Sequence, residues 1–288
     1  MGRRAVRFSV TLVATDRGPR VADIARAVEE LGLDGLWIPD HTHIPVSRDS
    51  PYPLGGELPD RYRRNLEALS AVAMAAAATS RIRVGTGVLL AALRDPIVTA
   101  KALATIDQQS GGRVAVGVGY GWNREEMLDH RVDPATRRAR TREHVLAMRN
   151  LWEREIAGYD GGFVSIAPSW SWPKPAQRPH PPIILGGETD HTLRRVIEYC
   201  DGWFPRPRGG FDVVQGVARL RQMAQAKGRD PATLMTIVFG APNDAKVLES
   251  YEKAGIEGAL LAIPDDSPDD ILRYLDKIAP LAKVGVPA

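Results

Sequence analysis

The sequence of 288 residues contains a single cysteine, Cys200. One thiol provides neither a disulfide framework nor a thiolate metal cluster. The chain also lacks an apolar run of roughly 20 residues, the length that a membrane-spanning helix needs. No long apolar segment follows the basic residues at its start, so we expect no signal peptide. These absences lead us to expect a cytoplasmic protein without a membrane partner.

An excess of charge of one sign is also missing. The 38 basic and 35 acidic residues leave a net charge of only +3. This balance does not indicate a nucleic-acid partner, but it is compatible with a small anionic ligand. The apolar fraction of 44% and the charged fraction of 25% are those of an ordinary globular protein.

Apolar segments of strand length alternate with amphipathic segments of helix length along the whole chain. Such alternation predicts a parallel sheet, and eight repeats favour an α/β fold of the (β/α)8 TIM-barrel type with rim insertions. We expect one domain, residues 1–288. A hairpin is expected over residues 158–169. The expected strands are residues 6–13, 35–38, 82–86, 113–118, 183–185, 202–204, 233–239 and 258–263, and the expected helices are residues 20–31, 65–79, 98–109, 135–156, 189–199, 213–227, 245–254 and 268–282.

Chemically active side chains follow the second expected strand. Pro39 ends this strand, because proline lacks the N–H that a central strand must donate. Asp40, His41 and His43 come directly after it. Titratable groups just past the carboxyl end of a buried strand lie where α/β barrels keep their chemistry. We therefore take these three residues as candidates for the functional site.

The two histidines also raise the possibility of a metal site, because a His-x-His pair at a barrel rim can ligate a metal, as in amidohydrolases. Such a site needs further histidines after later strands and a carboxylate after the last strand. Asp265 could supply the carboxylate, but two glycines follow the fifth strand and Phe204-Pro205 ends the sixth. We expect no metal, and a metal-dependent hydrolase remains the alternative of different chemistry.

Glycines follow three other strands. Gly186-Gly187 leads into a helix N-terminus, which suits close approach by a phosphate, although a plain strand-to-helix turn is equally consistent. Residues 117–121 read GVGYG, which resembles a nucleotide-binding pattern without its spacing. A β-bulge or a flexible loop would explain this second segment equally well.

Tryptophans and arginines in the expected loops allow two interpretations each. Trp122, Trp170 and Trp172 could form the wall of an apolar pocket or anchor their loops on the barrel, and we favour anchors for the last two. Four arginines open the long helix, and a solvated helix face is favoured for them over an anion-binding edge. These arginines are Arg137, Arg138, Arg140 and Arg142.

Taken together, four segments resemble the luciferase-like monooxygenase superfamily, which comprises flavin- and deazaflavin-dependent (β/α)8 enzymes. They occur in the family order and cover residues 6 to about 205, whereas the last third matches only as strand–helix alternation. The segments read EELGLDGLWIPDH from residue 29, IRVGTGVL from residue 82, SGGR with GVGYGW from residues 110 and 117, and PHPPIILGG with DGW from residues 179 and 201.

The resemblance implies a role for each candidate residue. A bulge with a cis peptide at Gly87-Val88, beside Thr86, would back the ring system of the cofactor, and Asp40 would face the polar edge of the ring. His41 would be the acid/base, since histidine titrates near neutral pH. The cofactor tail would contact Gly119, Tyr120 and Gly121, its phosphate would lie at Gly186, Gly187 and Glu188, and the substrate pocket would include His43 and Trp122.

Within this superfamily we favour the branch that uses coenzyme F420, a deazaflavin, because of the Pro-Asp-His ending, the compact length and a slightly basic chain suited to a polyglutamate tail. Sugar-phosphate dehydrogenases of this branch carry a catalytic glutamate where this chain has Trp122. We therefore expect hydride transfer with a more apolar small-molecule substrate than glucose-6-phosphate. The resemblance also implies a homodimer. An FMN-dependent two-component monooxygenase and a non-enzymatic carrier of the ring remain alternatives.

Overall fold

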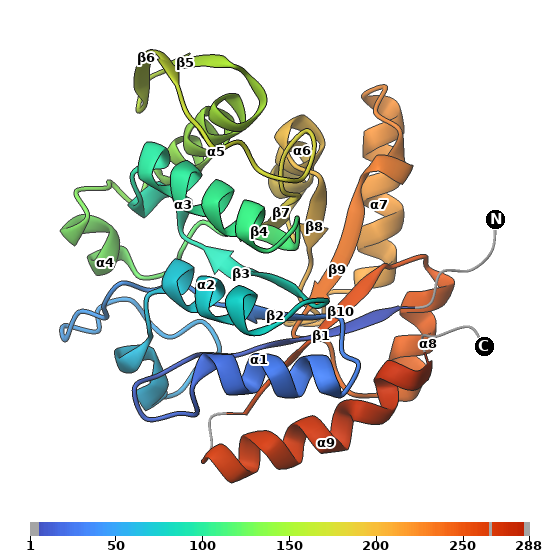
Figure 1. The fold of residues 1–288 in the computed structure, drawn as a ribbon. Helices are drawn as coiled ribbons and strands as arrows, with labels where there is room; N and C mark the ends of the chain where they lie inside the picture. The colour runs from blue at the N-terminus through green and yellow to red at the C-terminus, as the bar shows by residue number, and fades with distance from the viewer. Residues whose placement is uncertain (1–5, 265–266, 285–288) are drawn as a thin grey trace.

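Eight parallel strands close into a barrel in the computed structural model, which describes residues 6–264 and 267–284 (Figure 1). The strand order is β1-β10-β9-β8-β7-β4-β3-β2, and every neighbouring pair is parallel. The predicted (β/α)8 barrel is therefore confirmed. The barrel strands are β1 (Arg7–Thr11), β2 (Gly35–Ile38), β3 (Arg83–Leu89), β4 (Val114–Val118), β7 (Ile183–Gly186), β8 (Gly202–Phe204), β9 (Met235–Phe239) and β10 (Gly258–Ala262).

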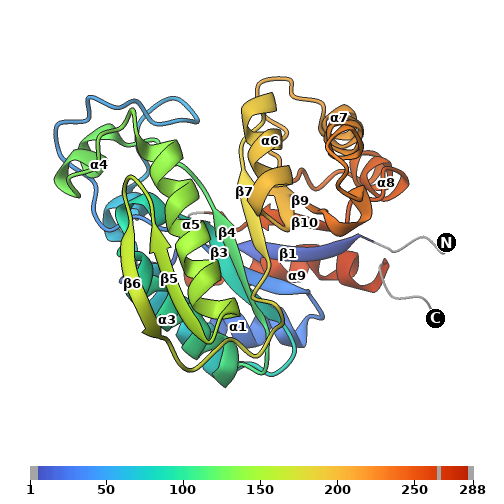
Figure 2. The ribbon, with the colours of Figure 1, turned by 90° about the horizontal axis from the view of Figure 1, so that it is seen from above.

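Helices cover the outside of the barrel, as the view from above shows (Figure 2). Between consecutive parallel strands of the barrel, helices return the chain to the start of the next strand, as a right-handed crossover requires. The α-helices are α1 (Val21–Glu30), α2 (Ala68–Ala78), α3 (Pro96–Gln109), α4 (Arg124–Asp129), α5 (Arg137–Glu153), α6 (Asp190–Tyr199), α7 (Val213–Ala226), α8 (Ala245–Lys253) and α9 (Pro268–Val284), and the short 3₁₀ helices are η1 (Asp60–Arg64), η2 (Ala91–Leu93) and η3 (Pro231–Thr233).

Two features differ from the predicted elements around the rim. The six-residue helix α4 was not predicted, and it begins after Asn123, whose side chain accepts a hydrogen bond from the backbone N–H of Glu126. The second helix begins at Ala68, with Glu67 as its N-cap residue, rather than at residue 65. Both boundaries are set by side-chain capping, which hydrophobic periodicity does not detect.

The predicted hairpin forms β5 (Ile156–Asp160) and β6 (Ser165–Trp170), an antiparallel pair that lies against α5 outside the barrel (Figure 2). Glu143 of α5 accepts hydrogen bonds from the backbone N–H groups of Gly162, Phe163 and Val164, at 2.7–3.2 Å. The turn of the hairpin is therefore fixed to the first half of α5.

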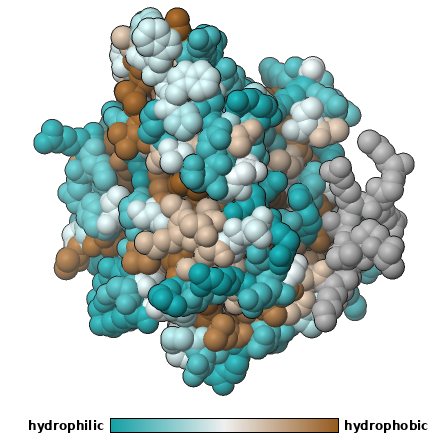
Figure 3. All heavy atoms as spheres, viewed as in Figure 1, coloured by the Kyte–Doolittle hydropathy of each residue, from teal (hydrophilic) through white to brown (hydrophobic). Residues whose placement is uncertain are grey.

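The interpretation of Trp170 and Trp172 as rim residues that anchor loops is wrong. Trp170 pairs with Ile156, directly after the end of α5, so it lies toward the end of the barrel opposite the rim. The two tryptophans are 75% and 56% exposed. The molecular surface on the side seen in Figure 1 is mainly hydrophilic, with separate apolar patches (Figure 3). The hairpin turns back along α5, and this reversal takes its last residue away from the functional rim.

The interior of the barrel is closed by large apolar side chains. Trp37 of β2 and Phe204 of β8 pack edge to face, with ring centroids 5.1 Å apart, and Ile237 and Leu260 complete this layer. Val88 and Phe239 pack against the layer and are only partly buried. The barrel is therefore a packed core, and a ligand can enter only above this layer.

Two further expectations concern a membrane-spanning helix and the carboxylate of a metal site. No helix of the described part of the chain is long and apolar enough to cross a membrane. Asp265, the carboxylate considered for a metal site, lies outside the described residues.

Candidate functional site

His41 lies directly after β2 and is held by two hydrogen-bond partners. Its Nδ1 is 2.7 Å from Oε2 of Glu126, and its Nε2 accepts a hydrogen bond from the indole N–H of Trp122 at 3.2 Å. The side chains of His41 and Glu126 are 7% and 1% exposed. The candidate acid/base is therefore a buried histidine paired with a buried carboxylate.

Glu126 is a site residue that the sequence did not reveal. It is the third residue of α4, and the cap at Asn123 fixes the start of that helix. Its other carboxylate oxygen accepts the backbone N–H of Thr42 at 3.0 Å. The pattern Asn-x-x-Glu is a capping signature, and it was the available signal. Here the glutamate reaches His41 instead of closing the capping box.

Aromatic rings surround the His41 imidazole. Tyr62 and Trp122 contact it edge to face, with centroids 5.8 and 5.7 Å away, and Tyr52 contacts both of these rings. The loop that carries Tyr52 is tied down where Ser50 donates its backbone N–H and its hydroxyl to Glu125. Trp122, a predicted pocket residue, is thus brought to His41.

His43, the other predicted pocket residue, faces away from this group. Its Nε2 is 3.0 Å from Asp129, and its Nδ1 is 2.9 Å from the hydroxyl of Thr42. The His43 side chain is 43% exposed. The two histidines therefore have separate carboxylate partners, and no group of three or more histidine, cysteine or acidic residues suited to a metal occurs within residues 6–264 and 267–284.

Asp40 is engaged with protein groups. Its Oδ2 accepts the Nε–H of Arg94 at 2.8 Å, and its Oδ1 accepts an Nη2–H of the same guanidinium at 2.7 Å. The backbone N–H of Leu90 also donates to Asp40, at 3.0 Å, and Arg94 further donates to Glu67. Asp40 thus joins the ends of β2 and β3, and a contact between Asp40 and a ring remains a prediction.

The end of β3 has the expected irregular geometry. The peptide bond between Gly87 and Val88 is cis, and the register with β4 shifts between Thr86 and Leu89. The hydroxyl of Thr86 donates to the carbonyl of Gly117 at 2.8 Å. A Cβ on Gly119 would lie 2.4 Å from Cγ2 of Val88, so this glycine makes room for the Val88 side chain. The predicted bulge and cis bond are confirmed.

A basic edge lies beside Tyr120, and we define it by Arg138, Arg194 and Arg195. The Arg138 guanidinium lies 5.7 Å from the centroid of the Tyr120 ring. Burial and the same three arginines lower the pKa of His191, whose Nε2 is buried without a hydrogen-bond partner in the described part of the chain. Arg138 is exposed, as predicted for a solvated helix face, and its guanidinium also lies over the ring of a candidate site residue.

Gly186 and Gly187 end β7 and precede α6. A Cβ on Gly186 would have no atom closer than 3.6 Å, whereas one on Gly187 would lie 2.7 Å from Oγ1 of Thr192. Gly187 also has a φ of +127°. Its carbonyl accepts the indole N–H of Trp203 at 2.7 Å. A Cβ on Gly186 would therefore make only ordinary contacts, with the carbonyl oxygens of Val118 and Phe204 and with Cγ1 of Val88. The position of Gly186 before a helix N-terminus is compatible with a phosphate there.

Glu188, also predicted to contact the cofactor, is paired with Arg206. The Nε and Nη2 groups of Arg206 donate to its carboxylate at 2.7 and 3.1 Å. This pairing offsets a negative charge that would otherwise oppose a phosphate at the start of α6.

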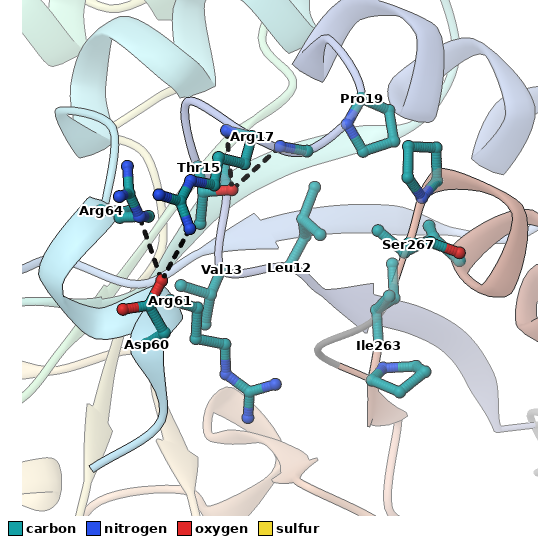
Figure 4. Close-up of a pocket in the computed structure, with 15 residues that line it drawn as sticks. Leu12, Val13, Thr15, Arg17, Pro19, Asp60, Arg61, Arg64, Ile263 and Ser267 are labelled. Carbon is teal, nitrogen blue, oxygen red and sulfur yellow. Dashed lines mark hydrogen bonds and ion pairs between the residues drawn. The ribbon is translucent and has the colours of Figure 1, made fainter.

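A cavity of about 250 Å³ opens at the rim where β1 and β10 end (Figure 4). Val13 and Ile263 line it from the two strand ends, and Asp60, which accepts from Arg17 and Arg64, lines it from η1. Arg61 also lines it and is next in sequence to Tyr62, which contacts His41. The cavity is therefore lined from the ends of β1 and β10 and from η1, and His41 is not among its lining residues.

Comparison with known proteins agrees with this geometry. The sequence model of the family described as luciferase-like monooxygenase matches residues 6–267. The chain belongs to the luciferase-like monooxygenase family. An uncharacterized protein, Rv0953c of Mycobacterium tuberculosis, is 41% identical over 276 residues, which cover 94% of this chain and 97% of the relative.

The family includes members that depend on different ring cofactors. An F420-dependent glucose-6-phosphate dehydrogenase of Kineococcus radiotolerans is 31% identical over 73% of this chain and 59% of its own length. An FMNH2-dependent dimethylsulfone monooxygenase of Pseudomonas putida is 31% identical over 53% of this chain and 42% of its own length. The fold is also that of the monooxygenase RslO1 from Streptomyces bottropensis, with a TM-score of 0.77, 20% identity and coverage of 96% and 98% of the two chains.

Proposed function

We propose that this family member transfers a hydride between coenzyme F420 and a small, apolar organic substrate at the barrel mouth. The observation that carries the proposal is the basic edge beside Tyr120. Arg138 stacks on Tyr120 and forms no ion pair with a carboxylate among the described residues. Three neighbouring arginines are more positive charge than a single phosphate needs. They suit a tail with several negative charges, such as that of F420.

The upper surface of the barrel core fits a flat ring. Val88 and Phe239 are partly exposed there, above the layer formed by Trp37 and Phe204. The orphaned Nε2 of His191 and the end of β7 at Gly186 lie on the side expected for the tail. The site would thus offer apolar side chains to the ring and hydrogen-bond donors to the tail, which suits an amphipathic cofactor.

The bound cofactor supplies the hydride chemistry, and the protein supplies orientation and a proton site. His41 holds or accepts a proton at Nε2, the nitrogen that Trp122 now contacts. Tyr52, Tyr62 and Trp122 form an aromatic wall that keeps water from this nitrogen. The same wall favours an apolar substrate.

The decisive experiment titrates purified protein with F420 and, separately, with FMN. We expect F420 fluorescence to be quenched at micromolar protein and FMN to bind more weakly by at least tenfold. Tight binding of FMN with no binding of F420 would overturn the assignment and favour the monooxygenase alternative.

His41→Ala separates an enzyme from a carrier. We expect this variant to bind F420 as the wild type does but to lose turnover with substrates that the wild type reduces or oxidises. Binding with no turnover by the wild type, across electron donors and acceptors, would favour a non-enzymatic carrier.

A further inference from the structure

We infer that Glu126 is a positioning residue that fixes His41 as its Nδ1–H tautomer, so that Nε2 is the proton-accepting atom at the barrel mouth. The inference rests on the proposed role of His41. It adds the residue that orients the imidazole.

The hydrogen-bond chemistry of Trp122 determines the tautomer. An indole N–H can only donate, so the Nε2 that it contacts at 3.2 Å must carry a lone pair. In a neutral imidazole the proton is then on Nδ1, which is 2.7 Å from Oε2 of Glu126. That oxygen is the acceptor of the bond, while Oε1 accepts from the backbone of Thr42.

Burial makes this pair different from the other histidine–carboxylate pair near it. The side chains of His41 and Glu126 are at least nine-tenths buried, whereas those of His43 and Asp129 are 43% and 60% exposed. Glu126 also stands on a capped helix start, which limits its movement. A buried acceptor on a fixed helix can hold one orientation of the imidazole, as the carboxylate does in serine hydrolase triads.

The contact with Trp122 also marks Nε2 as the nitrogen without a hydrogen. Because Nε2 already accepts the indole N–H, a proton donor that reaches this nitrogen must replace that contact.

A proton that reaches Nε2 would make the His41 imidazole cationic beside the Glu126 carboxylate. Glu126 would still accept the Nδ1–H bond in that state. A bound deazaflavin would supply the hydride chemistry.

The tautomer is measured on the cofactor-free protein, so the result is independent of whether F420 binds. Two-bond proton–nitrogen correlation spectra of protein labelled with ¹⁵N-histidine distinguish the two neutral tautomers, and His41→Gln assigns the signals. We expect wild type and Trp122→Phe to show only the Nδ1–H form, because the carboxylate still requires a donor. Trp122→Phe with Glu126→Ala should show the Nε2–H form.

An Nε2–H signal in the wild type, or a mixture of tautomers in Trp122→Phe, would overturn the role of Glu126. Trp172→Phe, at an exposed tryptophan far from the rim, controls for loss of an indole. Glu143→Gln controls for loss of a carboxylate that accepts backbone hydrogen bonds elsewhere. Both controls should keep the His41 signals of the wild type.

Discussion

Asp40 and Arg94 form a two-point ion pair at the rim, with N–O distances of 2.8 and 2.7 Å, and their side chains are 2% and 15% exposed. The pair joins the residue after β2 to the segment after β3. Since these strands carry His41 and the Gly87-Val88 bulge, the pair holds the two sides of the candidate site together. Its geometry is that of a carboxylate satisfied by a guanidinium fork.

Removing the guanidinium should destabilise the protein, because it leaves the Asp40 carboxylate buried without its counter-charge. We expect Arg94→Met to lower the free energy of unfolding by about 3 kcal/mol or more, and Asp40→Asn with Arg94→Met to recover part of the loss. Urea unfolding measures both. Arg64→Met removes exposed ion pairs with Asp16 and Asp60 and should cost about 1 kcal/mol or less. Equal losses for Arg94→Met and Arg64→Met would contradict the role of burial.

The two glycines after β7 should respond differently to an added methyl group. Gly187→Ala should lower stability by about 1–3 kcal/mol, since the Cβ would lie 2.7 Å from Thr192 and φ is +127°. Gly186→Ala should leave the cofactor-free protein as stable as the wild type, because its Cβ meets only ordinary contacts. Thermal unfolding checks both.

If a phosphate approaches Gly186, the same alanine should weaken F420 binding about tenfold or more. Unchanged affinity in Gly186→Ala would place the phosphate elsewhere. Affinity and stability are measured on the same protein samples, so a folding defect cannot be mistaken for a binding defect.

Arg138 should contribute to the salt dependence of cofactor binding. Arg138→Gln should weaken F420 binding and flatten the decrease in affinity with rising salt, because one charge facing the anionic tail is lost. Fluorescence titrations at several salt concentrations measure the slope. Arg81→Gln changes a 71% exposed arginine that precedes β3 at the opposite end of the barrel, and it should leave the slope unchanged. The same slope in Arg138→Gln and the wild type would argue against the basic edge as the tail site.

Glu29 should make stability depend on pH in the acidic range. Burial acts to raise its pKa, but hydrogen bonds from the backbone N–H groups of Arg81, Ile82 and Ser80 lower that pKa to about 2. A pKa that is lower in the folded state than in the unfolded state stabilises the protein above about pH 4.5, and this contribution is lost as the pH falls toward 2.

We therefore expect Glu29→Gln to lower the free energy of unfolding by about 1–3 kcal/mol at pH 7, with the difference from wild type shrinking between pH 5 and 2. Glu30→Gln, at the exposed neighbouring position, should show little change at any pH. Urea unfolding over this range is the measurement. A difference that does not change with pH would show that the ionised carboxylate is not the stabilising form.

Much of the fold could be predicted because its signals are local. The alternation of strand and helix periods indicated eight repeats, and Pro39 marked the end of a strand that the structure contains. The helix α4 was missed because six residues are too few to show a helical period. Trp170 and Trp172 were misplaced because nothing local indicates which way a hairpin turns relative to a helix.

Within the site, the sequence by itself determined that Asp40, His41 and the glycines after β3, β4 and β7 lie on one rim, since all follow parallel strands. Only the tertiary structure decided their partners. Glu126 is 85 residues from His41, and Arg94 is 54 residues from Asp40. Neither pairing follows from periodicity, because it depends on how loops from neighbouring strands cross above the barrel. His41 was predicted as a lone acid/base, and barrel closure places it between a carboxylate and an indole.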